Sequence, residues 1–340
     1  MGNIYGVDIG TSNFKMCCKD KEAILNEKNI IAIANKKELL AFGDEAYEMY
    51  EKAPENIEVS FPVKFGVIAD IENMQTLLMS FFNKINGGKK VAGGTDFYIA
   101  VPTDVTEVEK RAFYELVADS KAIKAKNIYI VDKPVADAIG AGLDVTKSRG
   151  VMVVNIGAET TEISVLSLGG IVISKSVKIG GNKLDDSIIS SIRNVYNLVI
   201  GSKTAENLKK ELGSAVQTEE KFATGFGRNV LSGLPVCLPI SSDVIFNAIV
   251  TPLHSIMDSI KVILERTPPE LAADIIKNGI YVSGGTSNIS NLEQFINSET
   301  NLKVNIVENP SESVVRGLMG VVTNPDFQKV AYTPQDRTYD

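Results

Sequence analysis

The sequence predicts an α/β protein built from two duplicated halves, and three observations support this fold class. A chain of 340 residues exceeds the size of a single compact core, so two lobes are expected. Strand-like segments alternate with helical ones, which is typical of a largely parallel sheet with helices on its faces. The stretch VDIGTSN at residues 7–13 also recurs as VNIGAET at residues 154–160, which indicates duplication of a domain.

The elements of the first half follow from local patterns. Residues 4–19 predict a strand, a turn and a returning strand, because β-rich residues flank a Gly/Thr/Ser/Asn cluster. Apolar residues at helical spacing then indicate helices, and unbroken apolar runs indicate buried strands. The helices are expected over residues 73–85, 107–120 and 135–143, and the strands over residues 96–102 and 127–134.

The second half begins with the repeated hairpin around residues 153–165 and continues in the same style. Helical periodicity predicts helices over residues 185–199 and 242–267. A β-rich segment lies between them at residues 214–240, and a strand is expected over residues 279–289.

Composition excludes several classes of function. The formal charge of -7 and the pI near 5.1 give no general attraction to a nucleic-acid backbone, so no nucleic-acid partner is expected. Three cysteines, two of them adjacent, form neither a disulfide framework nor a metal knuckle, which fits a reducing cytosol. His254 is the only histidine, which excludes a His-based triad or a multi-His metal site. No apolar run is long enough to predict a membrane span.

The repeated Gly turn has the chemistry of a phosphate-binding loop. Gly admits backbone conformations that point successive N–H groups at one anion, and Thr and Ser hydroxyls add donors. One such turn is more often a plain hairpin. Two copies in register, together with SGGTSN opening a helix at residues 283–288, favour a nucleotide site. Ligands of open α/β sheets lie at the carboxyl ends of strands, where these turns gather.

Longer stretches carry a more specific signal, and PPELAADII and GVIAD are far more specific than a Gly turn. On these stretches the chain resembles the actin, Hsp70 and sugar-kinase superfamily, and within it the bacterial actin family MreB, over nearly its whole length. The stretches are GVDIGTSN (6–13), FPVKFGVIAD (61–70), VPTDVTEVEKRA (101–112), KPVADAIGAGL (133–143), TTEISVLSLGG (160–170), VKIGGNKLDDSII (177–189), GSKTAENLKKELG (201–213), TPPELAADIIKNGIYVSGG (267–285) and ENPSESVVRG (308–317).

The resemblance implies an actin-like fold of two duplicated ribonuclease-H-like domains with ATP in the cleft between them. The implied subdomains are IA (residues 1–31, 73–144 and 315–340), IB (32–72), IIA (145–180 and 245–314) and IIB (181–244).

Matched position by position, the resemblance also assigns the nucleotide site. The matched residues are Gly10, Thr11, Ser12 and Asn13 in the first phosphate loop, Gly157, Thr160 and Thr161 in the second, Glu206 and Lys209 beside ribose and adenine, and Gly180, Gly181, Gly284, Gly285 and Thr286 around the adenosine. Asp8 would meet Mg²⁺ through water, because this ion dehydrates reluctantly.

Three positions depart from the family's catalytic pattern. An acidic residue of the family's EEP motif positions or activates the attacking water, but the segment here reads VDKP and places Lys133 there. An ammonium group has no lone pair with which to accept a proton. The family's second loop reads DIGGGTTE against NIGAETTE here, so Asn155 replaces a carboxylate and Glu159 replaces a glycine. We expect slow or undetectable hydrolysis with binding retained, because such groups contribute on the order of 10²- to 10⁴-fold in rate.

The candidate catalytic residues are therefore Lys133, Asn155, Glu159 and Thr160. We expect Lys133 and Glu159 to pair, so that their charges cancel in the cleft. The alternative is that Lys133 is a solvated lysine at a strand end and that Asp132 or Glu159 acts as the base. Neighbours in a strand point to opposite faces, so Asp132 should face away from the side chain of Lys133, which leaves Glu159 as the better candidate.

The resemblance also implies assembly. Bacterial actins join head to tail into protofilaments, here expected to be paired, so the partners are other copies of the chain or paralogous actins. The altered catalytic positions suggest a divergent paralogue, as in a wall-less bacterium with several copies. The loop at residues 88–94 has two lysines and only Val91 as a sizeable apolar residue, so membrane contact should be weak or indirect. We expect a cytoplasmic location that includes the inner face of the membrane.

Other functions on the same fold stay open as alternatives. They are an active ATPase, a small-molecule kinase of the sugar or acetate type, and an Hsp70-like chaperone. A kinase would need a base aimed at a substrate hydroxyl, and Lys133 argues against one. A chaperone would need a peptide-binding domain, and we do not expect one after the nucleotide-binding core.

Overall fold

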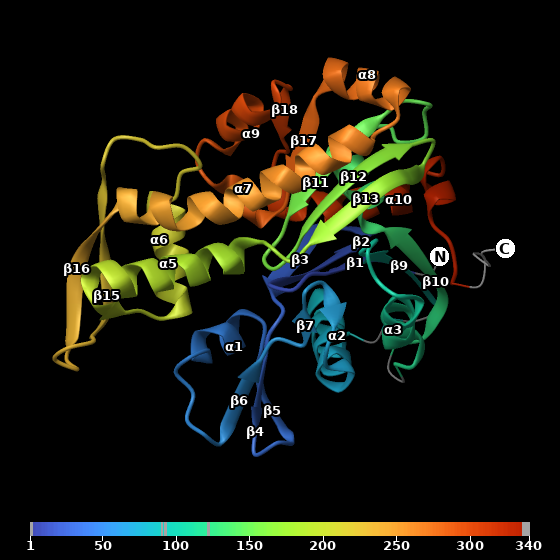
Figure 1. Ribbon diagram of the computed structural model, residues 1–340. Coiled ribbons are helices and arrows are strands. Elements are labelled where there is room, and N and C mark those ends of the chain that lie inside the picture. The colour runs from blue at the N-terminus through green and yellow to red at the C-terminus, as the bar shows by residue number, and fades with distance from the viewer. Residues whose placement is uncertain (1–2, 90, 92–93, 121–122, 335–340) are drawn as a thin grey trace.

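Two mixed five-stranded sheets dominate the computed structural model, which describes residues 3–89, 91, 94–120 and 123–334 (Figure 1). The strand orders are β10-β9-β1-β2-β3 and β13-β12-β11-β17-β18. In each sheet three successive strands pair antiparallel, and two later strands add in parallel beside the first of them. The second sheet therefore repeats the order of the first, as the duplicated sequence predicts.

The central strands are rich in Val and Ile and are buried on both faces, as expected for strands covered by helices on both sides. The first sheet contains β1 (Ile4–Ile9), β2 (Asn13–Cys18), β3 (Lys21–Lys28), β9 (Thr95–Val101) and β10 (Ala125–Asp132). The second contains β11 (Val151–Ile156), β12 (Thr161–Ser167), β13 (Gly170–Val177), β17 (Ile280–Ser283) and β18 (Val304–Ile306).

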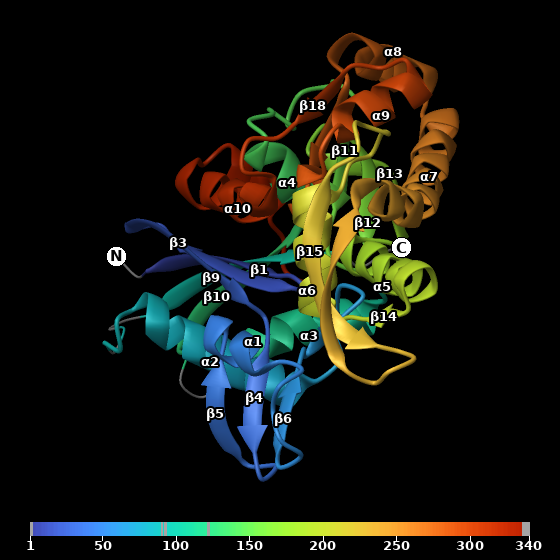
Figure 2. The same cartoon turned by 90° about the vertical axis from the view of Figure 1, so that its left-hand side faces the viewer.

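Two helices join the halves. α4 (Lys133–Gly140) and α10 (Ser313–Thr323) lie side by side, and α10 contacts β1 while α4 contacts β11 (Figure 2). Glycines let their backbones touch, since a Cβ added to Gly140 would lie 1.8 Å from the Ser313 carbonyl oxygen, and one added to Gly317 would lie 1.6 Å from that of Ala136. This close packing fixes where the first turn of α4 points.

The remaining helices cover the outer faces and the second half. They are α2 (Ile71–Ile85), α3 (Glu107–Ala118), α5 (Gly181–Tyr196), α6 (Ser202–Leu212), α7 (Ser242–Arg266), α8 (Pro269–Asn278) and α9 (Leu292–Thr300), with short 3₁₀ turns η1 (Gly285–Asn288), η2 (Pro310–Glu312) and η3 (Phe327–Val330). Asp70 and Thr106 cap α2 and α3 by accepting backbone N–H groups, as N-cap residues of these types commonly do.

Each half carries an inserted small sheet. The first has β4 (Ile31–Ala34), β5 (Glu38–Phe42), β6 (Ile57–Ser60) and α1 (Asp44–Met49), with the short pair β7 (Val63–Lys64) and β8 (Val67–Ile68) after it. The second has β14 (Leu198–Val199), β15 (Phe222–Asn229) and β16 (Pro235–Ser241). Figure 1 shows both insertions projecting from the two main sheets.

Several predicted boundaries are wrong. The strand predicted over residues 279–289 ends at Ser283, and residues 285–288 form the 3₁₀ turn η1. The strand predicted over residues 127–134 ends at Asp132, and Lys133 is already the first residue of α4, because Pro134 is tolerated in the first turn of a helix. The helix predicted from residue 185 begins at Gly181. Of the loop at residues 88–94, for which weak or indirect membrane contact is predicted, residues 90, 92 and 93 lie outside the described part of the chain. Within the described part, no helix has the length and apolarity needed to cross a bilayer.

Candidate functional site

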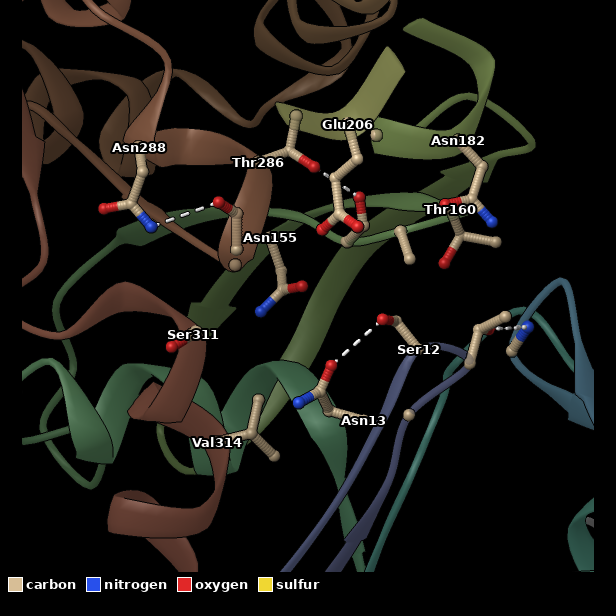
Figure 3. A pocket seen from close by; sticks show the side chains of 18 of the residues that line it. Ser12, Asn13, Asn155, Thr160, Asn182, Glu206, Thr286, Asn288, Ser311 and Val314 are labelled. Carbon is tan, nitrogen blue, oxygen red and sulfur yellow. Dashed lines mark hydrogen bonds between the residues drawn. The ribbon is translucent and has the colours of Figure 1, made fainter. Parts of the chain in front are cut away.

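A cavity of about 680 Å³ lies between the halves, where the carboxyl ends of β1 and β11 meet (Figure 3). Residues of the first half that line it are Asp8, Gly10, Thr11, Ser12, Asn13, Lys15, Asn26, Lys28, Gly66 and Lys133. Those of the second half and α10 include Asn155, Gly157, Ala158, Thr160, Gly181, Asn182, Asp185, Glu206, Lys209, Lys210, Gly284, Gly285, Thr286, Asn288, Ser311 and Val314. The structure thus brings together most of the residues that the sequence nominates.

The two glycine hairpins have the same backbone geometry. The Gly10 N–H donates to the Asn13 carbonyl at 3.1 Å, and the Gly157 N–H donates to the Thr160 carbonyl at 2.8 Å. A Cβ added to Gly10 would lie 2.7 Å from the Asn13 oxygen, and one added to Gly157 would lie 3.0 Å from the Thr160 oxygen. Glycine is therefore needed at both turns because the chain folds back onto itself.

Thr161 and Gly180 support the site instead of lining it. Thr161 is fully buried at the start of β12, and its hydroxyl donates to the Ile179 carbonyl at 2.7 Å, so the expectation that its side chain meets the nucleotide is corrected. Gly180 packs on the second hairpin, since an added Cβ would lie 2.7 Å from the Gly157 carbonyl oxygen. This contact lets the Gly181 N–H donate to that oxygen at 3.0 Å, which seats the start of α5 beside the loop.

Asp8 is the centre of a buried charged cluster. Its Oδ2 accepts a hydrogen bond from Lys15 Nζ at 3.0 Å, and its Oδ1 lies 4.0 Å from Lys133 Nζ. Burial raises the pKa of Asp8, but the two ammonium groups outweigh burial and leave this pKa below its ordinary value. Burial lowers the pKa of Lys133, but the charges of Asp8, Glu162 and Asp137 outweigh burial and raise it, so Lys133 is a cation.

The predicted pairing of Lys133 with Glu159 is wrong. No ion pair joins them within the residues that the structure describes, and Lys133 pairs with Asp8. Glu159 instead accepts a hydrogen bond from the Phe65 backbone N–H at 2.6 Å and lines an adjoining hollow between the insertions. Asp132 faces away from the cavity, as predicted, because its carboxylate accepts a hydrogen bond from the Tyr332 hydroxyl at 2.7 Å.

Asn155 is held by a buried carboxylate that the sequence analysis overlooked. Its Nδ2 donates to Asp137 Oδ2 at 3.0 Å and lies 3.0 Å from Ser283 Oγ, which itself bonds to Asp137. Burial is the main cause of the raised pKa of Asp137. The signal was available in the sequence, because Asp137 follows Lys133 by four residues and so shares its helix face once the helix begins at residue 133.

Glu206 and Lys209 border the far end of the cavity. Lys209 Nζ donates to Asp185 at 2.7 Å and to the Gly181 carbonyl at 3.0 Å, and burial is the main cause that raises the pKa of Asp185 to about 6. Glu206 bonds to Lys210 at 2.7 Å and accepts from the Tyr47 hydroxyl at 2.9 Å. Burial raises the pKa of Glu206, but these bonds and nearby cations outweigh it and lower the pKa to about 2. The Tyr47 contact joins α1 of the first insertion to α6 of the second half.

Other polar residues in the cavity were missed by the sequence analysis. They are Lys15, Asn26, Lys28, Asn182, Asp185, Lys210, Asn288 and Ser311. Lys15 had a readable signal, because alternate residues of a strand share a face and Lys15 is two residues beyond the predicted Asn13. Asn288 also had a signal, because it is the last residue of the SGGTSN turn, and the others come from segments with no turn motif of their own.

Comparison with known proteins identifies the family. A model of the family described as MreB/Mbl protein matches residues 2–330. The chain belongs to the MreB/Mbl family. Its MreB/Mbl relatives include the "Cell shape-determining protein MreB" of Escherichia coli, 36% identical over 321 residues that cover 93% of this chain and 92% of that one. The "Cell shape-determining protein Mbl" of Bacillus subtilis is 36% identical over 323 residues, 94% of this chain and 96% of that one.

Solved structures agree with the family assignment. MreB5 of Spiroplasma citri bound to ADP is 34% identical and superposes with a TM-score of 0.88, over 94% of this chain and 96% of that one. The MamK double helical filament, at 21% identity and a TM-score of 0.79, shows a likeness of fold only. The predicted actin-like fold of two ribonuclease-H-like domains is thereby confirmed.

Proposed function

We propose that this MreB/Mbl protein binds ATP in the cavity between its halves and assembles with further copies of itself or with paralogous actins into paired protofilaments. Two glycine hairpins that line one cavity, together with the hydroxyl residues Thr11, Ser12 and Thr160, are the observation that carries the proposal. The relatives' names describe them as cell shape-determining proteins. We therefore propose a role in cell shape or motility in the cytoplasm, with weak or indirect membrane contact. The ADP-bound and AMPPNP-bound MreB5 structures support an adenine nucleotide.

The site residues take the roles that the family pattern assigns. The hairpins Gly10–Asn13 and Gly157–Thr160 would cradle the phosphates, Glu206 and Lys209 would hold the ribose, and the Gly284–Thr286 turn would close over the adenosine. The boundaries of the four subdomains remain as proposed from the sequence.

The cavity fits a magnesium ion carried by the nucleotide. Asp8 Oδ1 is a buried oxygen beside the cavity, and within the described residues it has no hydrogen-bond partner. One carboxylate plus phosphate oxygens and water suffice for this ion, so Asp8 would hold it through water. The ion would neutralise charge on the phosphates.

We further propose that hydrolysis is slow. The position expected to activate water is filled by Lys133, a cation paired with Asp8, and Asn155 adds no negative charge. Glu159 is occupied by the Phe65 backbone and faces the adjoining hollow, so it is poorly placed to act as the base. Nucleotide would then act more as a structural element of the filament than as a timer.

Sedimentation and electron microscopy with Mg²⁺ and ATP, ADP or a nonhydrolysable analogue test this function. We expect pelleted filaments with ATP and with the analogue, and phosphate release far slower than assembly. A protein that stays monomeric with every nucleotide, or that turns ATP over rapidly, would contradict the proposal and favour a kinase or an active ATPase.

A further inference from the structure

The amide of Asn155 is held in one orientation by a buried acid behind it. Both short contacts of its Nδ2 are to Asp137 Oδ2 and Ser283 Oγ, each at 3.0 Å. A carboxylate is an acceptor, so it selects the NH₂ end of the amide. The oxygen end of the Asn155 amide consequently faces the cavity (Figure 3). Asn155 Oδ1 lies 4.0 Å from the point where a Cβ added to Gly157 would lie.

We propose that Asp137 is a positioning residue of the nucleotide site: it fixes Asn155 with its carbonyl oxygen toward the cavity, as an acceptor for water bound to the nucleotide's divalent cation. This inference rests on the proposed function, because the cation arrives with the nucleotide. The second half therefore keeps a carboxyl group beside the loop, on α4, while the loop itself presents a neutral oxygen. Asp137 acts through Asn155 and touches no ligand itself.

One consequence separates this role from simple packing. Asn155→Asp alone would place two carboxylates about 3 Å apart in a buried site, which is strongly unfavourable. Adding Asp137→Asn restores the hydrogen bond with the roles exchanged, because the amide at residue 137 then donates to the carboxylate at residue 155. The total side-chain volume of the pair stays the same. The exchanged pair also puts the carboxylate on the residue that lines the cavity.

The experiment compares four proteins: wild type, Asn155→Asp, Asp137→Asn and the double variant. Without nucleotide, we expect Asn155→Asp to lower the melting temperature by roughly 5 °C and the double variant to recover most of that loss. The affinity for a fluorescent ATP analogue is measured with Mg²⁺ and with EDTA, and the ratio of the two affinities shows how much Mg²⁺ tightens binding. We expect Asp137→Asn to lower this ratio about fivefold, because the Asn155 amide can then flip. The double variant should regain that tightening or exceed it.

Asp132→Asn combined with Asn155→Asp is the matched control, since Asp132 is also buried but faces Tyr332. Its effects should add without rescue. The inference is overturned if Asp137→Asn fails to rescue Asn155→Asp, or if Asp137→Asn binds Mg²⁺-ATP as tightly as wild type. If Asn155→Asp does not fold, recovery of folded protein in the double variant is the expected result and its absence overturns the inference. Wild type that binds no nucleotide would instead refute the proposed function.

Discussion

Near the end of β1, Asp8 lines the cavity and is held by a lysine. Near the end of β11, the corresponding residue is Asn155, which is held by an aspartate. Asp8 bonds to Lys15 from the neighbouring strand, and Asn155 bonds to Asp137 from helix α4. The backbone hairpins beside them match closely, with corresponding hydrogen bonds at 3.1 and 2.8 Å. The duplicated halves therefore have similar backbone geometry in this hairpin, and they differ in where the carboxyl group lies.

This difference shows that α4 sets the charges on both sides of the site. Two residues of this helix, one turn apart, make the contacts: Lys133 pairs with Asp8, and Asp137 accepts a hydrogen bond from Asn155. The cavity consequently has one carboxylate at its phosphate end, and that carboxylate lies between two ammonium groups. Substitutions that give the second half a carboxylate facing the cavity, as in the first half, should change the rate of ATP hydrolysis. Substitutions that remove the carboxylate of the first half should change the free energy of unfolding.

The largest expected effect comes from restoring an acid at residue 133 together with the exchanged pair. Lys133→Glu with Asp137→Asn and Asn155→Asp should raise the rate of ATP hydrolysis on the order of 10²-fold, because a carboxylate can accept a proton from water and an ammonium cannot. Phosphate release measures the rate. Lys133→Gln in the same background removes the charge without supplying a base, so an equal gain there, or no gain with Glu, would contradict the prediction.

Removing the carboxylate of the first half should destabilise the fold. Asp8→Asn leaves Lys15 without its buried counter-charge and removes the carboxylate with which Lys133 pairs, so we expect the free energy of unfolding to fall by about 3 kcal/mol. Urea denaturation measures this. Asp144→Asn, which breaks an exposed pair with Lys147, is the control and should change stability by less than about 1 kcal/mol.

The same pair predicts a pH dependence. The pKa of Asp8 is lower in the folded protein than its ordinary value of about 3.9, so its contribution to stability is present above that value and is lost as the pH falls through the lower folded pKa. Wild type should therefore lose stability between roughly pH 5 and the folded pKa, and Asp8→Asn should lose less over this interval. Equal slopes for the two proteins would show that Asp8 does not titrate as its ion pairs imply.

The smallest effects should distinguish the two turns. Gly10→Ala places a Cβ 2.7 Å from a backbone oxygen and should cost about 2 kcal/mol, whereas Gly157→Ala places it 3.0 Å away and should cost about 1 kcal/mol. Chemical denaturation of the two variants compares their free energies of unfolding. Gly142→Ala is not used as a control, because Gly142 has a positive φ that would strain an alanine. If Gly157→Ala were more destabilising than Gly10→Ala, the prediction would be contradicted, and the backbone of the first hairpin would be the one that relaxes more easily around an added Cβ.

The sequence by itself determined the backbone of this protein: the duplicated hairpins, the buried Val/Ile strands and the amphipathic helices all follow from residues close together in the chain. It also nominated most of the cavity, because glycine turns at strand ends have a recognisable local pattern. Only the tertiary structure decided which charges meet. Lys133 and Asp137 point where they do because α4 begins at residue 133, two residues earlier than its pattern suggests, and packs against α10 through Gly140 and Gly317. Electrostatic partners depend on distances between segments far apart in the chain, and packing sets those distances.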